Sequence, residues 1–267
     1  MLYTDFKKSQ IADVRKQNKY KDMIVLRLGD CLEVMKEIPS KSIDAIICDL
    51  PYGTTACKWD SIIPFDLLWE QYKRIIKDNG AIVLFGSEPF SSALRMSNIK
   101  MFRYDIIWKK SHARGFLNAW KQPMRKHENI SLFYKKQPTY NPILKDKDPK
   151  NIRPISKRSR STHFNGGEFS NEAKKRKCPN DKSMPDSILK YNSKVTPIQH
   201  PTQKPLELLE YLVETYTNKG DTILDNTMGS GTTMVACKKL GRNGIGIEKE
   251  EKYFKIAQER VNSFAQE

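Results

Sequence analysis

The chain has 267 residues, of which 38% are hydrophobic, and it carries a formal net charge of +16. That length suits one large α/β domain with an insertion, or two modest domains. The longest apolar runs, such as residues 81–85, are far shorter than the roughly 20 residues of a membrane span, and the chain begins with polar residues, which excludes a membrane protein and predicts a cytoplasmic one.

Strand and helix signals alternate along the first half of the chain. Short apolar runs that stop at Gly, Asp or Asn indicate strands, and apolar stripes with a period near 3.6 indicate helices. The expected strands are residues 23–28, 42–48 and 81–85, and the expected helices are residues 32–37, 65–77 and 89–98. Two later β-rich runs, 102–108 and 129–134, are expected to pair antiparallel.

The regular pattern is lost between Lys135 and Val195. This segment holds 16 Lys or Arg residues against 6 Asp or Glu residues, a net charge of +10, and it contains Asn-Gly-Gly at residues 165–167. Concentrated positive charge favours a polyanion as partner, because phosphate contacts release condensed counterions. The charge alone leaves two interpretations open, a nucleic-acid-binding insertion and a solvated basic insertion without a partner.

Strand and helix signals return after Pro205. The expected elements are helices over residues 206–216, over residues 232–240 and from residue 251 onward, and strands over residues 222–225 and 244–247. Strands that alternate with helices form βαβ units. We therefore predict an α/β fold with a mainly parallel, twisted sheet, helices on both of its faces and one insertion.

A glycine-containing turn follows the expected strand 222–225. Gly229 and Gly231 let a ligand approach the backbone closely, and the helix that begins near Thr232 supplies free amide donors. A phosphate-binding P-loop is excluded because the turn has no lysine. A dinucleotide fingerprint is excluded because Met234 stands where the third glycine is required.

Two acidic residues, Asp225 and Glu248, end the strands on either side of this turn and its helix. An acidic side chain at such a strand end can accept hydrogen bonds from both ribose hydroxyls, which selects a nucleoside without requiring a pyrophosphate. We therefore predict a nucleoside-binding site, with a purely structural turn as the alternative.

A second candidate site directly follows the buried strand over residues 42–48. Active sites of open parallel sheets lie beyond the carboxyl ends of the strands, where this chain places a carboxylate beside a proline and an aromatic ring. An ordinary turn is the alternative. The residues concerned are Asp49, Leu50, Pro51, Tyr52 and Gly53.

Three motifs together resemble those of DNA amino-methyltransferases. DLPYG at 49–53 resembles their Asp-Pro-Pro-Tyr motif, DNTMGSGTT at 225–233 resembles their cofactor motif, and HPTQKP at 200–205 looks like the sequence preceding it in the circularly permuted β class. The resemblance covers nearly the whole chain except its start and the basic insertion. It implies a circularly permuted, Rossmann-like methyltransferase fold, S-adenosylmethionine as cofactor, and N6 of adenine or N4 of cytosine as methyl acceptor.

The resemblance also implies which residues hold the cofactor. Asp30 would contact the adenine ring of S-adenosylmethionine, and Lys204, together with Thr202 and Gln203, would hold the methionine end. The remaining cofactor-binding candidates are those of the glycine turn and its flanking strands, namely Asp225, Gly229, Gly231, Thr232 and Glu248.

An exocyclic amino nitrogen is a poor nucleophile because its lone pair is delocalised into the ring. In the mechanism that the resemblance implies, the Asp49 carboxylate and the Leu50 main-chain carbonyl accept its two N–H bonds as positive charge develops. Tyr52 would stack on the target base after it has swung out of the duplex. Leu50 departs from the proline that is commoner in the family, which costs rigidity but keeps the carbonyl before Pro51.

The first residue of the catalytic motif bears on the target base. Asp49 favours N6 of adenine, since family members that act on N4 of cytosine more often begin with Ser, and N4 of cytosine is kept as the alternative. Methylation of cytosine carbon 5 needs a thiolate in a Pro-Cys setting, and the chain has no Pro-Cys dipeptide. The five cysteines and four histidines form no Cys-x-x-Cys pair or metal-spaced cluster, so we expect neither disulfides nor a metal site.

Two regions are candidates for DNA binding. In the first, cations flank the aromatic residues Phe116 and Trp120, a mixture suited to phosphate contacts and stacking. The second lies in the basic insertion, which is the candidate target-recognition region. The predicted DNA-binding residues are Lys109, Lys110, Arg114, Arg125, Lys174, Lys175, Arg176 and Lys177. We thus expect a catalytic part at residues 1–134, the target-recognition region at 135–195 and a cofactor-binding part at 196–267.

The expected partner is double-stranded DNA, and no membrane is expected. A homodimer and a companion restriction nuclease are each compatible with such an enzyme, and the sequence decides neither. An RNA or protein methyltransferase of the same fold is a rival interpretation, opposed by the motif order and by the basic insertion respectively. A DNA-binding module without activity is a second rival, which the intact catalytic and cofactor motifs oppose.

Overall fold

The computed structural model describes residues 24–54, 60–152, 178–193 and 200–264. They form two compact units, a larger one that combines the chain up to Asn141 with the chain from Ser187 onward, and a smaller one, Pro142–Asp186. No helix in the described ranges is long and apolar enough to cross a membrane. The order of the elements confirms the predicted α/β alternation.

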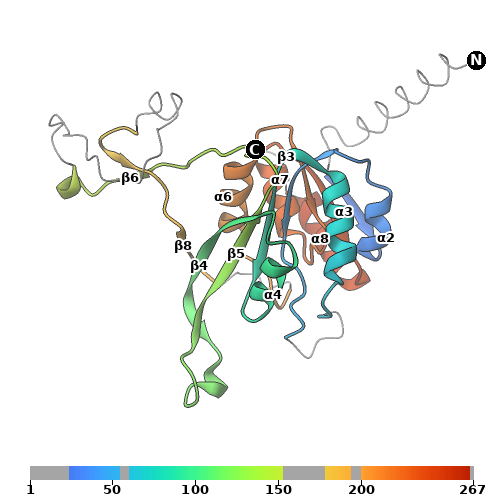
Figure 1. Ribbon diagram of the computed structural model, residues 1–267, viewed down its shortest axis with the longest axis horizontal. Helices are drawn as coiled ribbons and strands as arrows, with labels where there is room; N and C mark the ends of the chain where they lie inside the picture. Colours follow the sequence, from blue (N-terminus) through green and yellow to red (C-terminus); the bar gives the residue numbers. More distant parts are fainter. Residues whose placement is uncertain (1–23, 55–59, 153–177, 194–199, 265–267) are drawn as a thin grey trace, which may run out of the picture. The chain divides into compact units, whose positions relative to one another are not determined.

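The larger unit is built on an eight-stranded, mainly parallel sheet (Figure 1). The first five strands in spatial order are parallel to one another, β5 runs antiparallel to both of its neighbours, and β8 lies parallel to β4. The expected antiparallel pair is therefore confirmed. In spatial order the strands are β1 (Ile24–Leu28), β10 (Asn243–Glu248), β9 (Thr222–Asp225), β2 (Ile43–Cys48), β3 (Ile76–Gly86), β5 (Arg125–Phe133), β4 (Phe102–Arg114) and β8 (Ile188–Tyr191).

At the centre of the sheet, a strand from the first part of the sequence lies beside one from the last part. β2 pairs with β9, which aligns Ala45 with Ile223 and Ile46 with Leu224. Because β1, β10, β9 and β2 are parallel, the loops that follow them all leave from the same edge of the sheet. The circularly permuted arrangement that the resemblance implies is therefore present.

Helices cover both faces of the sheet, and successive side chains of β2 point alternately to the two faces. Ala45 and Ile47 belong to one buried cluster, whereas Ile46 and Cys48 belong to the other. The helices of the first cluster are α6 (Leu206–Tyr216), α7 (Thr232–Lys239) and α8 (Glu251–Ser263), and those of the second are α2 (Cys31–Lys36), α3 (Phe65–Ile75) and α4 (Phe90–Ser97).

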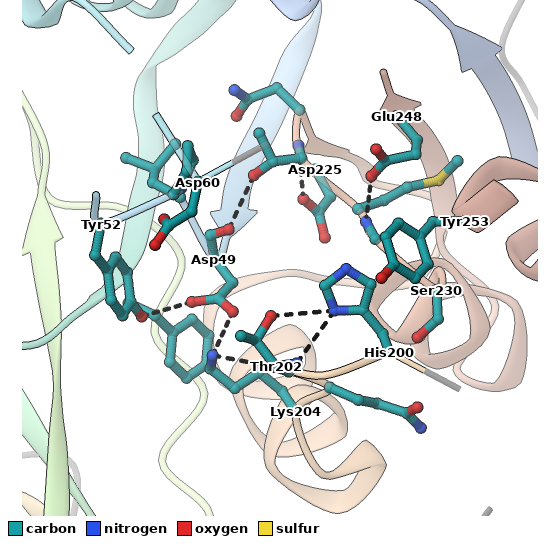
Figure 2. A pocket seen from close by; sticks show the side chains of 18 of the residues that line it. Asp49, Tyr52, Asp60, His200, Thr202, Lys204, Asp225, Ser230, Glu248 and Tyr253 are labelled. Atoms are coloured by element: carbon teal, nitrogen blue, oxygen red, sulfur yellow. Dashed lines mark hydrogen bonds and ion pairs between the residues drawn. The ribbon is translucent and has the colours of Figure 1, made fainter. Parts of the chain in front are cut away.

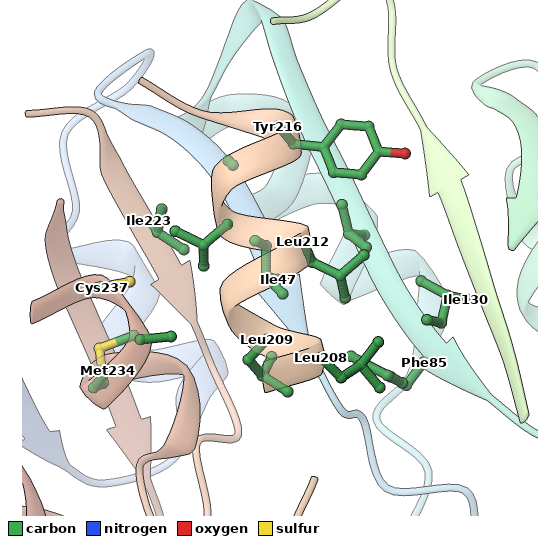
Figure 3. Packing of buried hydrophobic residues seen from close by; sticks show 14 of the residues in the cluster. Ile47, Phe85, Ile130, Leu208, Leu209, Leu212, Tyr216, Ile223, Met234 and Cys237 are labelled. Atoms are coloured by element: carbon green, nitrogen blue, oxygen red, sulfur yellow. The ribbon is translucent and has the colours of Figure 1, made fainter. Parts of the chain in front are cut away.

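Helix α6 shows how such a face is filled. Its leucines Leu208, Leu209 and Leu212 are buried and point toward the strands, as Figure 3 shows. Their spacing puts them on one face of the helix. Each fully buried leucine contributes about 1.5–3 kcal/mol, so this helix is held by its packing and not by its own helix propensity.

Strands β4 and β5 are longer than the sequence predicts and form a hairpin that projects from the sheet (Figure 1). The added part pairs Lys109 with His127 and Arg114 with Arg125. Its residues were missed because they are polar on both faces of the hairpin and lack the alternation that marks a half-buried strand. At the tip, Gly115 has a φ of 91° and precedes the 3-10 helix η2 (Phe116–Asn118).

The smaller unit is narrower than the expected insertion of residues 135–195. β6 (Lys145–Asp146) and β7 (Lys182–Ser183) pair antiparallel, η3 (Pro149–Asn151) follows β6, and Lys145 forms a 3.0 Å ion pair with Asp186. Strand β8, which lies within the expected insertion, belongs instead to the main sheet. The candidates Lys174, Lys175, Arg176 and Lys177 lie outside the described residues.

Candidate active site

A cavity of about 500 Å³ opens where the parallel strands end. It is lined by residues of both predicted sites, with Asp49 and Tyr52 from the segment after β2, and Gly229 and Glu248 from the segments after β9 and at the end of β10. The two motifs, far apart in the sequence, therefore share one pocket (Figure 2). Leu50, Pro51, Asp30, Thr202, Gln203, Lys204, Asp225 and Thr232 also line it.

The two glycines of the turn have different neighbours. Gly231 does not line the cavity; it precedes α7 with a φ of 76°, and a Cβ at this position would lie 2.9 Å from the Cβ of Ala257 in α8. Gly229 has a φ of 53°, and a Cβ there would lie 3.4 Å from the His200 ring. Gly231 thus allows two helices to approach, whereas Gly229 lines the pocket and donates its amide to Glu248.

The carboxylates at the nucleoside end are fixed by backbone amides. Glu248 accepts hydrogen bonds from the amide of Gly229 at 2.9 Å and from that of Glu250 at 2.8 Å. Burial raises the pKa of Glu248, although these amides oppose the effect. A carboxylate has about four acceptor sites, so Glu248 can still accept hydroxyl donors. Asp30 caps α2 through a 2.9 Å bond from the Leu32 amide and is half-exposed.

Asp225 and the residues after it connect the cofactor side to the catalytic side. Burial raises the pKa of Asp225 to about 6, and one of its oxygens accepts from the Thr227 amide at 3.2 Å. The Thr227 hydroxyl donates to the main-chain carbonyl of Asp49 at 3.0 Å. Next to them, Tyr72 donates to Asn226 at 2.5 Å inside the core.

On the catalytic side, both carboxylate oxygens of Asp49 have a donor (Figure 2). Tyr52 donates to Oδ1 at 2.5 Å, and the Lys204 ammonium pairs with Oδ2. Burial raises the pKa of Asp49, and Lys204 opposes that effect. The Tyr52 ring stacks on Phe90 with centroids 5.0 Å apart. The sequence predicted Lys204 near the cofactor but not its contact with the catalytic carboxylate.

Glu128, in β5, is a site residue that the sequence did not indicate. Its Oε2 lies 3.5 Å from the Lys204 ammonium, and its other oxygen pairs with Lys110. Lys110 in turn lies 5.0 Å from the Trp108 ring centroid. The only signal for Glu128 was an acidic residue within a strongly basic stretch, just before an expected strand.

Two further contacts shape the pocket and were also missed. The Asp60 carboxylate accepts hydrogen bonds from the amides of Gly53 and Thr54, both at 2.9 Å, and so holds the end of the catalytic motif. On the cofactor side, the His200 ring packs edge-on against Tyr253 with centroids 4.1 Å apart. Burial and the Lys204 charge lower the pKa of His200 to about 4, so its ring is neutral at pH 7.

The described DNA-binding candidates divide into two groups. Lys110 and Arg114 line the cavity, whereas Lys109 and Arg125 are exposed on the hairpin outside it. Arg125 also donates to the Ser87 hydroxyl. The same two strands therefore border the pocket and carry the projecting cations.

Comparison with known proteins gives a consistent result. The sequence model of the DNA methylase family N6_N4_Mtase matches residues 43–259. The chain is 28% identical over 247 residues to Type II methyltransferase M.HpaI of Haemophilus parainfluenzae, which covers 88% of this chain and 73% of that protein. It is also 28% identical over 275 residues to Type II methyltransferase M2.LlaDCHI of Lactococcus lactis subsp. cremoris, covering 92% and 91%.

Solved structures resemble the chain over most of its length. The M1.HpyAVI–SAM complex is 27% identical, with a TM-score of 0.60 over 90% of this chain and 100% of that one. The PvuII DNA methyltransferase, described as cytosine-N4-specific, is 15% identical with a TM-score of 0.64 over 93% and 92%. At that identity the second likeness concerns the fold alone.

Proposed function

The chain belongs to the N6_N4_Mtase family of DNA methylases, and from this we propose that it methylates N6 of adenine in duplex DNA. It is an S-adenosylmethionine-dependent DNA amino-methyltransferase. The observation that carries the proposal is the single cavity in which Asp49 and Glu248 both lie. In the roles we propose, Glu248 would hold the cofactor's nucleoside and Asp49 would accept the amino group on the other side of the same cavity.

The pocket fits the cofactor in size and in chemistry. Its volume is about 500 Å³, and Glu248 has acceptor capacity left for two ribose hydroxyls. Asp30 stands at the end of β1, where it can accept from the adenine amino group, and the amides that begin α7 lie beside the glycine turn. When bound, S-adenosylmethionine supplies an electrophilic methyl group on its sulfonium.

The residues on the catalytic side would activate the amino nitrogen. Asp49, when ionised, and the Leu50 carbonyl accept its N–H bonds, which draws the lone pair out of the ring and stabilises the positive charge of the transition state. Tyr52 presents its ring beside this acceptor, and its stacking on Phe90 keeps the ring in place. Adenine is favoured over cytosine by the Asp that begins the motif, as the resemblance implies.

One experiment tests both the activity and the base. Plasmid DNA is incubated with labelled S-adenosylmethionine and the protein, digested, and its nucleosides are separated. Label in N6-methyladenine is expected, and Asp49→Ala should abolish it, whereas Asp66→Ala, an exposed aspartate in the first turn of α3, should not. Label in N4-methylcytosine would show that the target base is cytosine and not adenine. If no label appeared in the DNA, the proposed function would be wrong.

The β4–β5 hairpin is proposed as one part of the DNA interface and the basic insertion as the target-recognition region. Residues 106–127 contain six Lys or Arg and no Asp or Glu. At the tip, Leu117 is 95% exposed and Trp120 is fully exposed. Large apolar side chains in water, surrounded by cations, suit stacking on bases with phosphates nearby. The division into residues 1–134, 135–195 and 196–267 rests on this assignment.

The similarity to proteins named Type II methyltransferases supports a role in restriction–modification. We propose that the methyl group protects a DNA site from a companion nuclease. Plasmid DNA purified from cells that express the protein should resist one restriction nuclease and remain sensitive to others. A plasmid from cells that express Asp49→Ala is the matched control.

A further inference from the structure

Four largely buried charges of alternating sign form a row across the catalytic side of the cavity. Lys110 pairs with Glu128, Glu128 lies 3.5 Å from Lys204, and Lys204 pairs with Asp49. Their side chains are 14%, 12%, 8% and 21% exposed, in that order. The row is neutral as a whole, which is the condition under which so many buried charges are tolerated.

The position of Lys204 creates a conflict with the chemistry. Its ammonium contacts the carboxylate that must accept the amino group of the base, and Tyr52 takes the other oxygen. Positive charge develops on the attacking nitrogen, so an ammonium held at this place would oppose the reaction. Burial lowers the pKa of Lys204, but Asp49 and Glu128 outweigh it and raise that pKa, so the lysine does not leave by losing its proton.

We propose that Glu128 is a positioning residue that takes over the Lys204 ammonium when the amino group of the target base docks on Asp49. This rests on the proposed function. The shift is short, because the Lys204 nitrogen already lies 3.5 Å from Glu128 Oε2. Glu128 is pre-positioned, since Lys110 binds its other oxygen and the pairing of β5 with β4 places it opposite Trp108.

Other charged or titratable groups near Lys204 do not offer it the same place. The hydroxyl of Tyr52 donates to Asp49, and the pKa of Tyr52 is raised well above its usual value by burial. His200 is neutral at pH 7, because burial and the Lys204 charge lower its pKa to about 4. Lys110 is itself a cation. Among the described side chains, Glu128 is thus the second carboxylate paired with Lys204 and can hold the displaced ammonium, alone or together with the methionine carboxylate that the resemblance assigns to Lys204.

The competing interpretation is that Glu128 only braces the hairpin through Lys110. The two roles differ for a pair of variants, Glu128→Gln and Lys110→Met. If the pair only braces the hairpin, removing either partner should have the same effect. If Glu128 receives Lys204, only Glu128→Gln should leave the ammonium on Asp49.

The test compares methyl transfer by the full chain with target duplex between pH 5 and 9. For Glu128→Gln we expect kcat to fall roughly 10- to 100-fold with little change in the KM for DNA, the scale of a lost alignment. The fall of kcat at low pH, the acid limb of the pH profile, should move to lower pH in this variant. A negative neighbour that raises the pKa of Asp49 is lost, and Lys204 stays close. Glu128→Asp should recover part of kcat.

For Lys110→Met the acid limb should not move to lower pH, since a positive neighbour is lost; a raised KM for DNA is compatible with its position in the pocket. Equal profiles for the two variants, or an unchanged kcat in Glu128→Gln, would overturn the proposal. If the wild type transfers no methyl group to DNA, the proposed function is wrong, and so is this inference. If only the comparison of the variants fails, the proposed function is unaffected.

Two measurements protect the test from a folding artefact. If Glu128→Gln does not fold because a buried cation loses its partner, the double variant Lys110→Met/Glu128→Gln restores neutrality and should show the same loss of kcat. Independently of activity, the ¹⁵N signal of the Lys204 ammonium should shift by more when wild-type protein binds target duplex than when Glu128→Gln does. Equal shifts in the two proteins would contradict the transfer to Glu128.

Discussion

The hydroxyl of Thr227 donates a 3.0 Å hydrogen bond to the main-chain carbonyl of Asp49, 178 residues away in the sequence. The side chain of Cys48, the residue before Asp49, also contacts this hydroxyl, with its Sγ 2.9 Å away. The bond from Thr227 to Asp49 therefore ties the backbone of the proposed amino-group acceptor to the segment of the proposed cofactor site.

Replacement of Thr227 by Val should separate alignment from folding. The variant keeps the shape but leaves the Asp49 carbonyl without its donor, which should cost about 1 kcal/mol of unfolding free energy. The rate of a single methyl-transfer turnover should fall by roughly tenfold or more, because the acceptor loses its alignment. Thr227→Ser, which keeps the hydroxyl, is the control. Equal rates for the two variants would show that the bond does not align the site.

Gly231 should not tolerate a side chain. Its φ is 76° and a Cβ would lie 2.9 Å from that of Ala257, so Gly231→Ala should lose about 1–3 kcal/mol of stability and weaken S-adenosylmethionine binding. Gly241→Ala is the matched control, because Gly241 has a φ of 69° with open space around it. Calorimetric unfolding and cofactor titration measure both effects. An equal loss in the two variants would mean that packing against α8 is unimportant.

Removal of the Lys204 charge should change the pH dependence of methyl transfer. Lys204 opposes the effect of burial on Asp49, so in Lys204→Met the pKa of Asp49 rises further. Because the reaction needs the ionised carboxylate, the acid limb of kcat/KM should move to higher pH, by roughly one unit or more. Lys36→Met, on the exposed face of α2, is the control. A limb that stayed in place would remove Lys204 from the electrostatics of the site.

Asp225 should make folding stability depend on pH. Its pKa is about 6 in the folded protein against 3.8 for the free side chain, so the unfolded chain loses the proton first and ionisation favours unfolding. The resulting loss of unfolding free energy is absent below about pH 4 and grows as the pH rises to 6. Above pH 6 it reaches roughly 2–3 kcal/mol. Urea unfolding of Asp225→Asn and the wild type across this range should diverge by that amount. Parallel curves would contradict the buried, raised pKa.

The exposed hairpin tip should contribute to DNA binding and not to folding. Trp120 is 100% exposed, so Trp120→Ala should leave the unfolding free energy within about 0.5 kcal/mol. It should weaken binding of a labelled duplex by the roughly 1–3 kcal/mol of a base–aromatic contact. Met96→Ala, at a residue 70% exposed on α4, should do neither. Unchanged affinity in Trp120→Ala would remove the tip from the interface.

Features that depend on neighbouring residues could be predicted from the sequence, whereas contacts between distant segments could not. Strands β2 and β9, the glycine turn and the cluster from Asp49 to Tyr52 were predictable because each is encoded within a few neighbouring residues. Glu128 and the Lys204–Asp49 pair were not, because no local pattern records that β5 faces the segment before α6. The arms of the hairpin were missed for another reason: their side chains are polar on both faces, so the sequence shows no apolar–polar alternation.

The position of β1 affects the order in which the protein can be completed during synthesis. Within the described sheet β1 is an edge strand whose neighbour is β10, and Ile24–Leu28 pair with Gly244–Glu248. Of the described strands, β1 is the first to be synthesised and β10 is the last, so β1 must wait for β10 before it can enter the sheet. Glu248, at the end of β10, lines the cavity, so the pocket is completed late in the synthesis of the described residues.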